Sequence, residues 1–358
     1  MNPVRLLDLR QVPALRSQTV YHAVAHAMTQ QTADTIILVS PSHPYVCIGY
    51  HQELEKEVDL EYCRTHALPV YRREVGGGAV YLDDGQVFAQ WIFQPGHLPI
   101  DLTERFSLYI KPLVETYRAF GIEAYHRPVN DVHVGGKKIG GTGAAQVGNA
   151  EVVVGSLMFS FDKQTMAKVL RVSSEKMRDK IVQGLEQYMT TMTELLGSVP
   201  DQEKVKQEYV RHCAKALGRE IVAGSWSDGE EAMAVELDER FESDEWLYQR
   251  GGLRQVGVKI HEDIRVVEGA WKAPGGLIRV TARLSDGCID DISLSGDFTM
   301  LPAFALAGLE AALRGVRADE RSVVTRVSEV YQMLRIQSPG VSVEDFGKAF
   351  SEAVDGRQ

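Results

Sequence analysis

The spacing of hydrophobic and polar residues along the chain predicts an alternation of helices and strands. Residues 15–30 carry apolar side chains at helical spacing, and the apolar runs at 35–40 and 45–50 have the length of buried strands. A short helix at about 54–65 follows them. The helical period returns at 105–121, where the segment ends on a glycine, a favoured residue for terminating a helix.

Between and after these helices, short runs rich in β-forming residues predict further strands. They lie at 68–74, 79–83, 86–93, 122–127 and 151–161. The two glycine-containing connections among them are short, as in hairpins, and leave no room for a crossover helix. The pattern predicts an α+β fold with mixed and antiparallel sheets flanked by helices.

A second unit is predicted in the C-terminal third of the chain. Residues 162–218 are helical and polar in pattern, and an acidic segment at 227–246 indicates a helix beside a domain boundary. Three or four strands, a helix at 304–316 and a helical C-terminal segment are expected after it. We therefore expect a first domain at 1–240 and a second, smaller α+β domain at 246–358.

Composition narrows the classes of function. With 358 residues the chain is long enough for two domains, and its hydrophobic fraction of 44% is typical of globular proteins. The net charge of −10 argues against nucleic acid as a partner. No apolar stretch approaches the ~18–20 residues of a membrane span, and the charges near the N-terminus argue against a signal peptide. We expect a cytoplasmic protein with no membrane partner.

The cysteines and histidines show no metal-binding or disulfide pattern. Four cysteines stand far apart, at Cys47, Cys63, Cys213 and Cys288. None forms a CxxC pair, and reduced thiols are the default in the cytoplasm. His22 and His26 are one helical turn apart but lack a third ligand, which favours a structural role over metal binding.

Two glycine-containing segments carry the main candidates for ligand binding and catalysis. The first, RREVGGGAVYLD from Arg72 to Asp83, places three consecutive glycines between β-forming runs. Such glycines let the backbone adopt unusual dihedral angles or lie directly against a ligand. The second, NDVHVGGKKIGGTG from Asn130 to Gly143, places Lys138 between glycines in a predicted hairpin. Together they predict an anionic, nucleotide-like ligand held by backbone amides and fixed positive charge.

These segments resemble the lipoate–protein ligases, within the wider group that includes biotin protein ligases and octanoyltransferases. The RRxxGGGAVYxD run is similar to the family's lipoate-binding loop, and Asn130-Asp131 followed by GKKIGG is similar to its NDxxxxGKKIxG segment. Upstream, IGYHQ at 48–52 matches an IGxxQ element. A weaker similarity at 275–316 is to the small accessory domain of the family. The resemblance implies the catalytic fold of this group with a second, accessory domain.

The resemblance also implies a two-step reaction that uses ATP and Mg²⁺. Lipoate would first be activated as lipoyl-AMP with release of pyrophosphate, and the lipoyl group would then pass to a lysine of an acceptor protein. The implied acceptor is a lipoyl domain or a protein like the H protein of glycine cleavage. The resemblance to the family's accessory domain implies a further expectation. Deletion from about Trp246 onward should impair activation of lipoate more than transfer of the lipoyl group from preformed lipoyl-AMP.

Individual residues receive roles from the same resemblance. Lys138 is the expected catalytic lysine, with Lys137 as the alternative, because adjacent residues of a strand face opposite sides. Asp131 would help to hold magnesium, which prefers one or two carboxylates together with phosphate oxygens. Of the two arginines, Arg73 is favoured for ligand contact. The expected lipoyl-AMP-binding residues are Arg72, Arg73, Gly76, Gly77, Gly78, Ala79, Asn130, Asp131 and Gly141.

Four positions depart from the family's pattern. Val75 stands where Ser or Thr is common, Leu82 where His is usual, Gln86 where Asn often occurs, and Val154 where many ligases carry His. These changes affect polar contacts around the expected pocket. They leave open whether the acyl substrate and the acceptor are the usual ones of the family.

Three alternative functions stay open. An octanoyltransferase of the same fold would need a nucleophilic cysteine near the pocket lysine, and no cysteine lies between Cys63 and Cys213. A biotin–protein ligase usually carries a GRGRxxR-like loop, which GGGAVY does not match. A non-catalytic acyl-binding relative is the third alternative, and retention of Lys138 argues against it.

Overall fold

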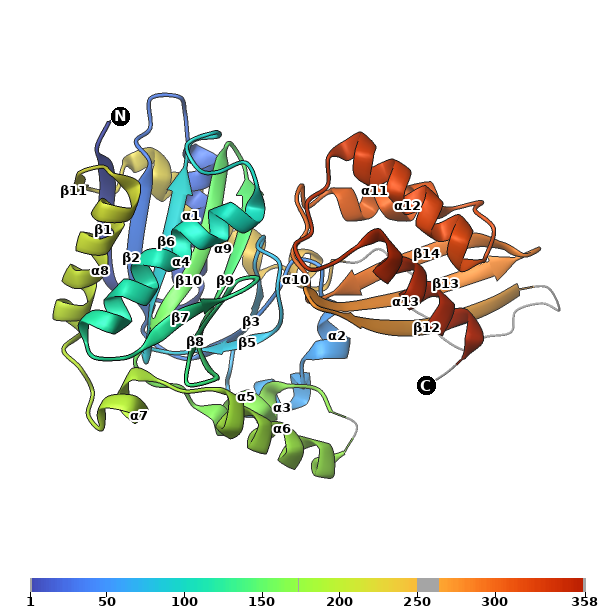
Figure 1. The fold of residues 1–358 in the computed structure, drawn as a ribbon, viewed down its shortest axis with the longest axis horizontal. Helices are drawn as coiled ribbons and strands as arrows, with labels where there is room; N and C mark the ends of the chain where they lie inside the picture. The colour runs from blue at the N-terminus through green and yellow to red at the C-terminus, as the bar shows by residue number, and fades with distance from the viewer. Residues whose placement is uncertain (1, 173, 250–263, 357–358) are drawn as a thin grey trace. The chain divides into compact units, whose positions relative to one another are not determined.

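The computed structural model describes residues 2–172, 174–249 and 264–356. The chain divides into two compact units (Figure 1). Unit 1 comprises Met1–Ile48, Leu54–Glu74 and Ala79–Leu247, and unit 2 comprises Gly49–Glu53, Val75–Gly78 and Tyr248–Gln358. The main division thus follows Leu247, and two short segments of the N-terminal half belong to unit 2. Residues 250–263, where strands of the second domain were expected to begin, lie outside the described residues.

The described part of unit 1 is built on a mixed sheet of eight strands in the order β11-β1-β2-β6-β10-β9-β8-β7. The strands are β1 (Val4–Val12), β2 (Thr35–Pro41), β6 (Gln86–Phe93), β7 (Ala124–Arg127), β8 (Asp131–Val134), β9 (Lys137–Val147), β10 (Ala150–Met158) and β11 (Ile221–Ala223). β11, β1 and β2 pair in parallel, and the remaining neighbours pair antiparallel. The predicted α+β class with a mixed sheet is confirmed.

Helices cover both faces of this sheet (Figure 1). Adjacent residues of the buried strand β6 face opposite sides. Gln90 Nε2 donates to the backbone oxygen of Ser17 in α1 (Ala14–Ala27) at 3.0 Å, whereas Trp91 Nε1 donates to Tyr209 Oη in α8 (Gln202–Leu217) at 3.0 Å. α9 (Asp228–Glu242) packs with α1, and α4 (Leu102–Ala119) packs with α8. The two helix pairs therefore cover opposite faces.

The predicted helices of this unit are present with changed limits. The segment expected at 15–30 is α1, which ends at Ala27, and the segment expected at 105–121 is α4, which begins at Leu102 because Asp101 caps it. The segment at 54–65 divides into two short helices. The remaining helices are α2 (Leu54–Glu57), α3 (Leu60–Thr65), α5 (Lys163–Val169), α6 (Glu175–Tyr188), α7 (Met192–Leu196) and α10 (Asp244–Tyr248).

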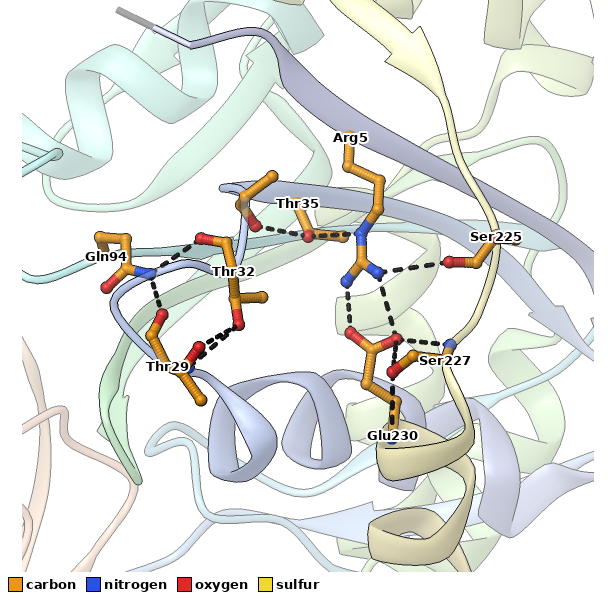
Figure 2. A network of polar contacts seen from close by, with 9 residues as sticks. Arg5, Thr29, Thr32, Thr35, Gln94, Ser225, Ser227 and Glu230 are labelled. Atoms are coloured by element: carbon orange, nitrogen blue, oxygen red, sulfur yellow. Dashed lines mark hydrogen bonds and ion pairs between the residues drawn. The ribbon is translucent and has the colours of Figure 1, made fainter.

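Strands β1 and β11 were not predicted, because charged residues interrupt the apolar pattern at 4–12 and β11 is only three residues long. The structure shows how the charge in β1 is accommodated (Figure 2). The Arg5 guanidinium pairs with Glu230 in α9 and donates to the backbone oxygen of Ser225 at 3.3 Å. Burial alone would raise the pKa of Glu230, but hydrogen bonds from Arg5 and Ser227 lower it overall. The ion pair therefore joins β1 to α9.

A second, three-stranded sheet carries the segment with three glycines. β3 (Tyr45–Ile48) lies in the middle, parallel to β4 (Val70–Arg72) and antiparallel to β5 (Val80–Leu82). The prediction of a hairpin around the glycines is wrong, because β3 lies between the two strands that flank them. The connection between β4 and β5 must instead cross the sheet by one strand position.

The described part of unit 2 beyond Tyr248 is a three-stranded antiparallel meander with three helices. Its strands are β12 (Ile264–Ala273), β13 (Gly276–Ser285) and β14 (Cys288–Gly296), and its helices are α11 (Ala305–Leu313), α12 (Glu320–Leu334) and α13 (Val343–Asp355). Buried residues of the sheet and the helices, among them Ile278, Leu309 and Phe346, form one core. The predicted second, smaller α+β domain is confirmed. Within the described ranges, no helix is both long enough and apolar enough to span a membrane.

Candidate active site

The lysine-containing segment forms the predicted hairpin from β8 and β9. Its turn residues, Gly135 and Gly136, have φ angles of 54° and 84°, in the left-handed region that two-residue hairpin turns require. An irregularity in the pairing places Asp131 opposite Gly141. The first residues of β8 and the middle of β9 are thereby brought together on the hairpin.

The two adjacent lysines of β9 make separate contacts, as strand alternation predicts. Lys138 Nζ lies 2.8 Å from Asp131 Oδ1, whereas Lys137 Nζ donates to the backbone oxygen of Glu186 in α6 at 3.3 Å. The side chain of Lys138 is 38% exposed, so its ammonium group is held and still accessible to a ligand. Lys138 is thus the better placed of the two for a charge-stabilising role.

The backbone around Lys138 is shaped to hold this ion pair. A Cβ atom at Gly141 would lie 2.9 Å from Lys138 Nζ and 3.5 Å from Asp131 Oδ1, so the absence of a side chain there makes room for the pair. Asn130 fixes the adjoining backbone: its side chain donates to the Thr142 oxygen, and Thr142 N and Oγ1 donate to the Asn130 oxygen at 2.9 and 3.0 Å. The sequence-predicted residues Asn130, Asp131, Lys138 and Gly141 therefore form one cluster.

The three glycines form a loop that packs closely against backbone within unit 2. Gly77 has φ of 96°, and its N–H donates to the Phe298 oxygen at 3.4 Å. A Cβ atom at Gly76 would lie 2.7 Å from the same oxygen, and one at Gly49 would lie 1.9 Å from the Gly77 oxygen. Close backbone approach therefore explains these glycines locally. Gly78 ends the loop, and Ala79 leads back into unit 1.

One residue of the IGxxQ element has a clear structural role that the sequence analysis did not assign. Gln52 is buried, and its Oε1 accepts from the N–H of Gly49 at 2.9 Å while its own N–H donates to the Gly49 oxygen at 3.2 Å. The side chain thus closes the turn that brings Gly49 under the glycine loop. The sequence feature that could have indicated this role is the spacing of Gly49 and Gln52 within the IGxxQ element.

The two arginines before the glycine loop differ in their surroundings. Arg72 is 1% exposed, and its guanidinium donates to the Leu247 oxygen from Nε at 3.0 Å and from Nη2 at 2.8 Å. Arg73 is half-buried and donates from Nη1 to the Cys47 oxygen at 3.3 Å. The greater exposure of Arg73 agrees with its preference as the ligand-contacting arginine, which stays a prediction.

The described cysteines are all free thiols. Cys47, Cys63 and Cys213 are buried, and burial raises the pKa of each, to about 11 for Cys63. Cys288 is partly exposed at the start of β14 in unit 2. A thiol must ionise to act as a nucleophile, so the three buried cysteines are poorly suited to that role.

Both ring nitrogens of His22 have protein partners. Nδ1 donates to the Gln18 oxygen at 2.7 Å, and Nε2 accepts from the N–H of Glu74 at 3.2 Å. His22 is therefore structural, as the sequence analysis favoured. In the described part of the chain, no three His, Cys, Asp or Glu side chains are grouped as a metal site would require.

The four positions that depart from the family's pattern lie in mixed surroundings. Val75 and Gln86 are buried, and Leu82 and Val154 are half-buried. Gln86 Nε2 donates to the Tyr81 oxygen at 3.4 Å, so this side chain links the end of β5 to the start of β6.

A cavity of about 560 Å³ is lined by residues of unit 2. Its lining includes Arg314, Arg317, Arg321 and Arg326. Arg314, Arg317 and Arg326 pair with Asp291, Asp319 and Glu329 at 3.0, 3.3 and 3.4 Å. None of the sequence-predicted site residues lines this cavity.

The comparison with protein families gives one match over more than half of the chain. The family model described as "Lipoyl protein ligase A/B catalytic domain" matches residues 14–214. This range contains every residue of the Lys138 cluster and of the glycine loop.

Individual relatives carry two kinds of name. The chain is 24% identical over 316 residues to the lipoate-protein ligase LplJ of Bacillus subtilis, which covers 87% of this chain and 89% of the relative. It is 27% identical over 277 residues to the octanoyltransferase LipM of Kyrpidia tusciae, covering 70% and 100%. Among solved structures, it is similar to a bipartite lipoate protein ligase of Thermoplasma acidophilum, described together with its E2 lipoyl domain. That match has a TM-score of 0.64 and 26% identity, and covers 72% of this chain and 100% of the other.

Proposed function

The chain belongs to the lipoyl protein ligase A/B catalytic-domain family, and we propose that it is an ATP-dependent lipoate–protein ligase. In the first step, a carboxylate oxygen of lipoate attacks the α-phosphorus of ATP, which yields lipoyl-AMP and releases pyrophosphate. In the second step, the amine of an acceptor lysine attacks the acyl carbon, loses a proton and displaces AMP. The ion pair of Lys138 with Asp131 carries the proposal.

Lys138 supplies the fixed positive charge from which both steps benefit. Negative charge develops on phosphate oxygens in the first step and on the acyl oxygen in the second, and a preorganised cation stabilises both. Asp131 holds the ammonium group at 2.8 Å, and Gly141 leaves the space that it occupies. The charge is therefore already oriented before the substrates bind, which lowers the entropic part of the barrier.

The proposed magnesium ion would arrive with ATP. Asp131 is the residue that would hold it, since one carboxylate and several phosphate oxygens complete the coordination that Mg²⁺ prefers. The ion would neutralise charge on the departing pyrophosphate. Arg73, Asn130 and the residues Gly76–Ala79 stay proposed contacts of lipoyl-AMP, and Arg72 is proposed to support them from its buried position.

The proposed acceptor is a lipoyl domain or an H-protein-like carrier that presents a lysine. The similar ligase of Thermoplasma acidophilum, which was described with a lipoyl domain, supports this proposal. We place the reaction in the cytoplasm, because all described cysteines are free thiols and a reducing compartment keeps them so.

An octanoyltransferase is the second candidate, because several relatives carry that name. Transfer through a thioester needs an accessible cysteine of low pKa. Burial raises the pKa of Cys47, Cys63 and Cys213, which opposes that role. The raised pKa values of these buried thiols favour ligation.

Adenylate formation by purified protein with lipoate, ATP and Mg²⁺ tests the proposal. We expect ATP-dependent formation of lipoyl-AMP with lipoate, and a loss of about 10²–10³-fold in turnover in Lys138→Ala, similar to the loss of one oxyanion donor. Lys137→Ala is the matched control, because its ammonium contacts α6 instead of Asp131. It should retain near-normal turnover. Octanoate and biotin are tested as alternative acids.

The outcomes separate the candidates. Near-normal adenylate formation by Lys138→Ala would show that the assigned role is wrong. If the wild-type protein forms no adenylate with any acid, octanoyl transfer from an acyl carrier protein is assayed next. Activity there would establish the transferase. Lipoate binding with neither activity would establish a non-catalytic acyl-binding protein.

A further inference from the structure

Residues Arg72–Glu74 directly precede the glycine loop, Val75–Gly78, and we call them the loop entry. Glycines carry no side chain that restricts their own backbone, so the start and direction of such a loop depend on the residues that anchor its ends. At this loop entry, each of the three residues is held by a segment distant in sequence. The contacts with α9, α10 and α1 all lie within unit 1.

Arg72 is bonded in both directions to the end of α10. Trp246 Nε1 donates to the Arg72 oxygen at 2.9 Å. In return, the buried guanidinium of Arg72 donates twice to the Leu247 oxygen. Backbone and side chain of one residue are therefore fixed by two consecutive residues of the same segment, which restricts rotation as well as translation.

Glu74 is held by three side chains from two helices. Its N–H donates to His22 Nε2 at 3.2 Å, and its carboxylate lies 3.3 Å from His26 Nε2 and 3.3 Å from Arg240 Nη1. Arg240 lies over the ring of Trp246, with its guanidinium carbon 4.2 Å from the ring centroid. The two residues that reach the loop entry from 240–246 thus also contact each other.

Arg73 completes the loop entry through β3. Its N–H donates to the Ile48 oxygen at 3.1 Å, and its guanidinium donates to the Cys47 oxygen. These contacts fix the residue that is proposed to touch the ligand. Its two neighbours, Arg72 and Glu74, depend on residues 240–247, which lie beyond the family match at 14–214.

We propose that Trp246 and Arg240 are positioning residues, which hold the loop entry so that Arg73 and the glycine loop are presented to lipoate in one conformation. This inference rests on the proposed function for its substrate. They act through Arg72 and Glu74 and touch no reacting atom. Loss of such positioning lowers the fraction of protein with the loop ready to bind, and therefore raises the apparent dissociation constant for lipoate.

Trp246→Phe tests the proposal, with Trp226→Phe as the matched control. Each change keeps an aromatic ring and removes one indole N–H. Trp246 donates to the Arg72 oxygen, whereas Trp226, which lies just before α9, donates to Glu231 in α9 at 2.8 Å. Both rings pack at the edge of the same hydrophobic cluster, so their effects on folding should be comparable. We expect Trp246→Phe to raise KM for lipoate about fivefold, the effect of one lost hydrogen bond, with kcat within about twofold of wild type.

A purely structural role would give a different pattern. Partial unfolding would lower the active fraction, and hence kcat, at unchanged KM. That pattern in Trp246→Phe, or an equal rise in KM in Trp226→Phe, would overturn the proposal. Arg240→Gln repeats the test with every aromatic side chain kept, and Arg211→Gln on α8 is its control, because Arg211 contacts Glu208 and His212 of its own helix.

Amide hydrogen exchange makes the inference independent of catalysis. The peptide spanning residues 70–79 should exchange several-fold faster in Trp246→Phe than in wild type and Trp226→Phe, whatever the substrate proves to be. Unchanged exchange there would refute positioning even if adenylate is formed. Failure of the wild-type protein to form adenylate would instead refute the proposed function and leave the exchange result to decide the positioning of the loop.

Discussion

His22 shows at the scale of one residue how the fold uses a titratable group without charging it. It is fully buried in α1, donates to the Gln18 oxygen and accepts from the N–H of Glu74. Burial is the largest cause that lowers its pKa from 6.5 to about 4, although the nearby Glu74 carboxylate opposes the shift. The neutral ring is therefore required, because only an unprotonated Nε2 can accept the Glu74 hydrogen.

We expect the free energy of unfolding to fall as the pH is lowered from about 6.5 to 4. In the unfolded chain His22 binds a proton near pH 6.5, whereas in the native protein it does so only near pH 4. The contribution of His22 to the free energy of unfolding is therefore complete above pH 6.5 and is lost as the pH falls towards 4. The shift corresponds to about 3 kcal/mol in full, with protonation breaking the bond to Glu74. Denaturant titrations of wild type and His22→Gln measure it as a difference in pH dependence. His66→Gln, at an exposed histidine, should retain the wild-type dependence.

The types of the candidate site residues could be predicted from the sequence, but most of their partners could not. Alternation along a strand correctly separated Lys138 from Lys137, because strand geometry is local. Arg72 was expected at the ligand, yet its guanidinium donates to Leu247, which is 175 positions away. Nothing in the local pattern around Arg72 indicates that contact, since only the folded chain brings the two together.

The β8–β9 hairpin illustrates at the scale of an element how backbone shape controls a side chain. Two positive-φ glycines set its turn, and a third, Gly141, leaves space for the ammonium of Lys138. The neighbouring Gly140 has a different environment: a Cβ atom there would meet nothing closer than the Ser156 oxygen at 3.5 Å, an ordinary contact. Two adjacent glycines of one strand therefore have unequal tolerance for a side chain.

Gly141→Ala should reduce adenylate formation by at least about tenfold while the protein stays folded. The new methyl group would lie 2.9 Å from Lys138 Nζ, at the far end of a flexible side chain that can move away. Displacing a reacting charge by about 1 Å can cost as much as 10²-fold. Turnover and circular dichroism are measured together, with Gly140→Ala as control. Equal losses in the two variants would mean that the effect is general to β9.

Elements with a strong local period were predictable, and those that depend on long-range pairing were not. The helices α1 and α4 and the buried strands β2 and β6 follow from apolar spacing alone. β1 was missed because Arg5 interrupts its pattern and finds its counter-charge in Glu230, 225 positions later. The expected β4–β5 hairpin failed because β3 pairs with both strands, a topology that short connections do not reveal.

At the scale of the whole molecule, the two units are interleaved along the chain. Unit 2 takes Gly49–Glu53 and Val75–Gly78 from the N-terminal half and combines them with the C-terminal meander. Two backbone hydrogen bonds join these segments within unit 2. The N–H of Gly77 donates to the Phe298 oxygen at 3.4 Å, and the N–H of Gly296 donates to the His51 oxygen at 3.0 Å. The boundary expected from composition alone could not include such short insertions, because four or five residues carry no compositional signal.

Truncation after Tyr248 should impair formation of lipoyl-AMP more than transfer from lipoyl-AMP supplied in advance. This limit keeps Trp246 and Leu247, which hold Arg72, but removes Phe298 and its contact with Gly77. The freed loop must then be ordered by substrates, and preformed lipoyl-AMP brings the binding energy of both reacting parts in one molecule. Both steps are assayed after circular dichroism has verified a folded fragment. Equal loss of both steps would contradict the expectation.

The bond between Gly77 and Phe298 also has a consequence for the order of events during translation. The glycine loop leaves the ribosome roughly 220 residues before Phe298, which at ~5–20 residues per second is an interval of about 10 to 45 seconds. Throughout that time the glycine loop has been synthesised, but the backbone around Phe298 that packs on it has not. The contact therefore belongs to the last stage of maturation, and ribosome-bound chains stalled before residue 298 should expose the 75–78 segment to proteases that the finished protein resists.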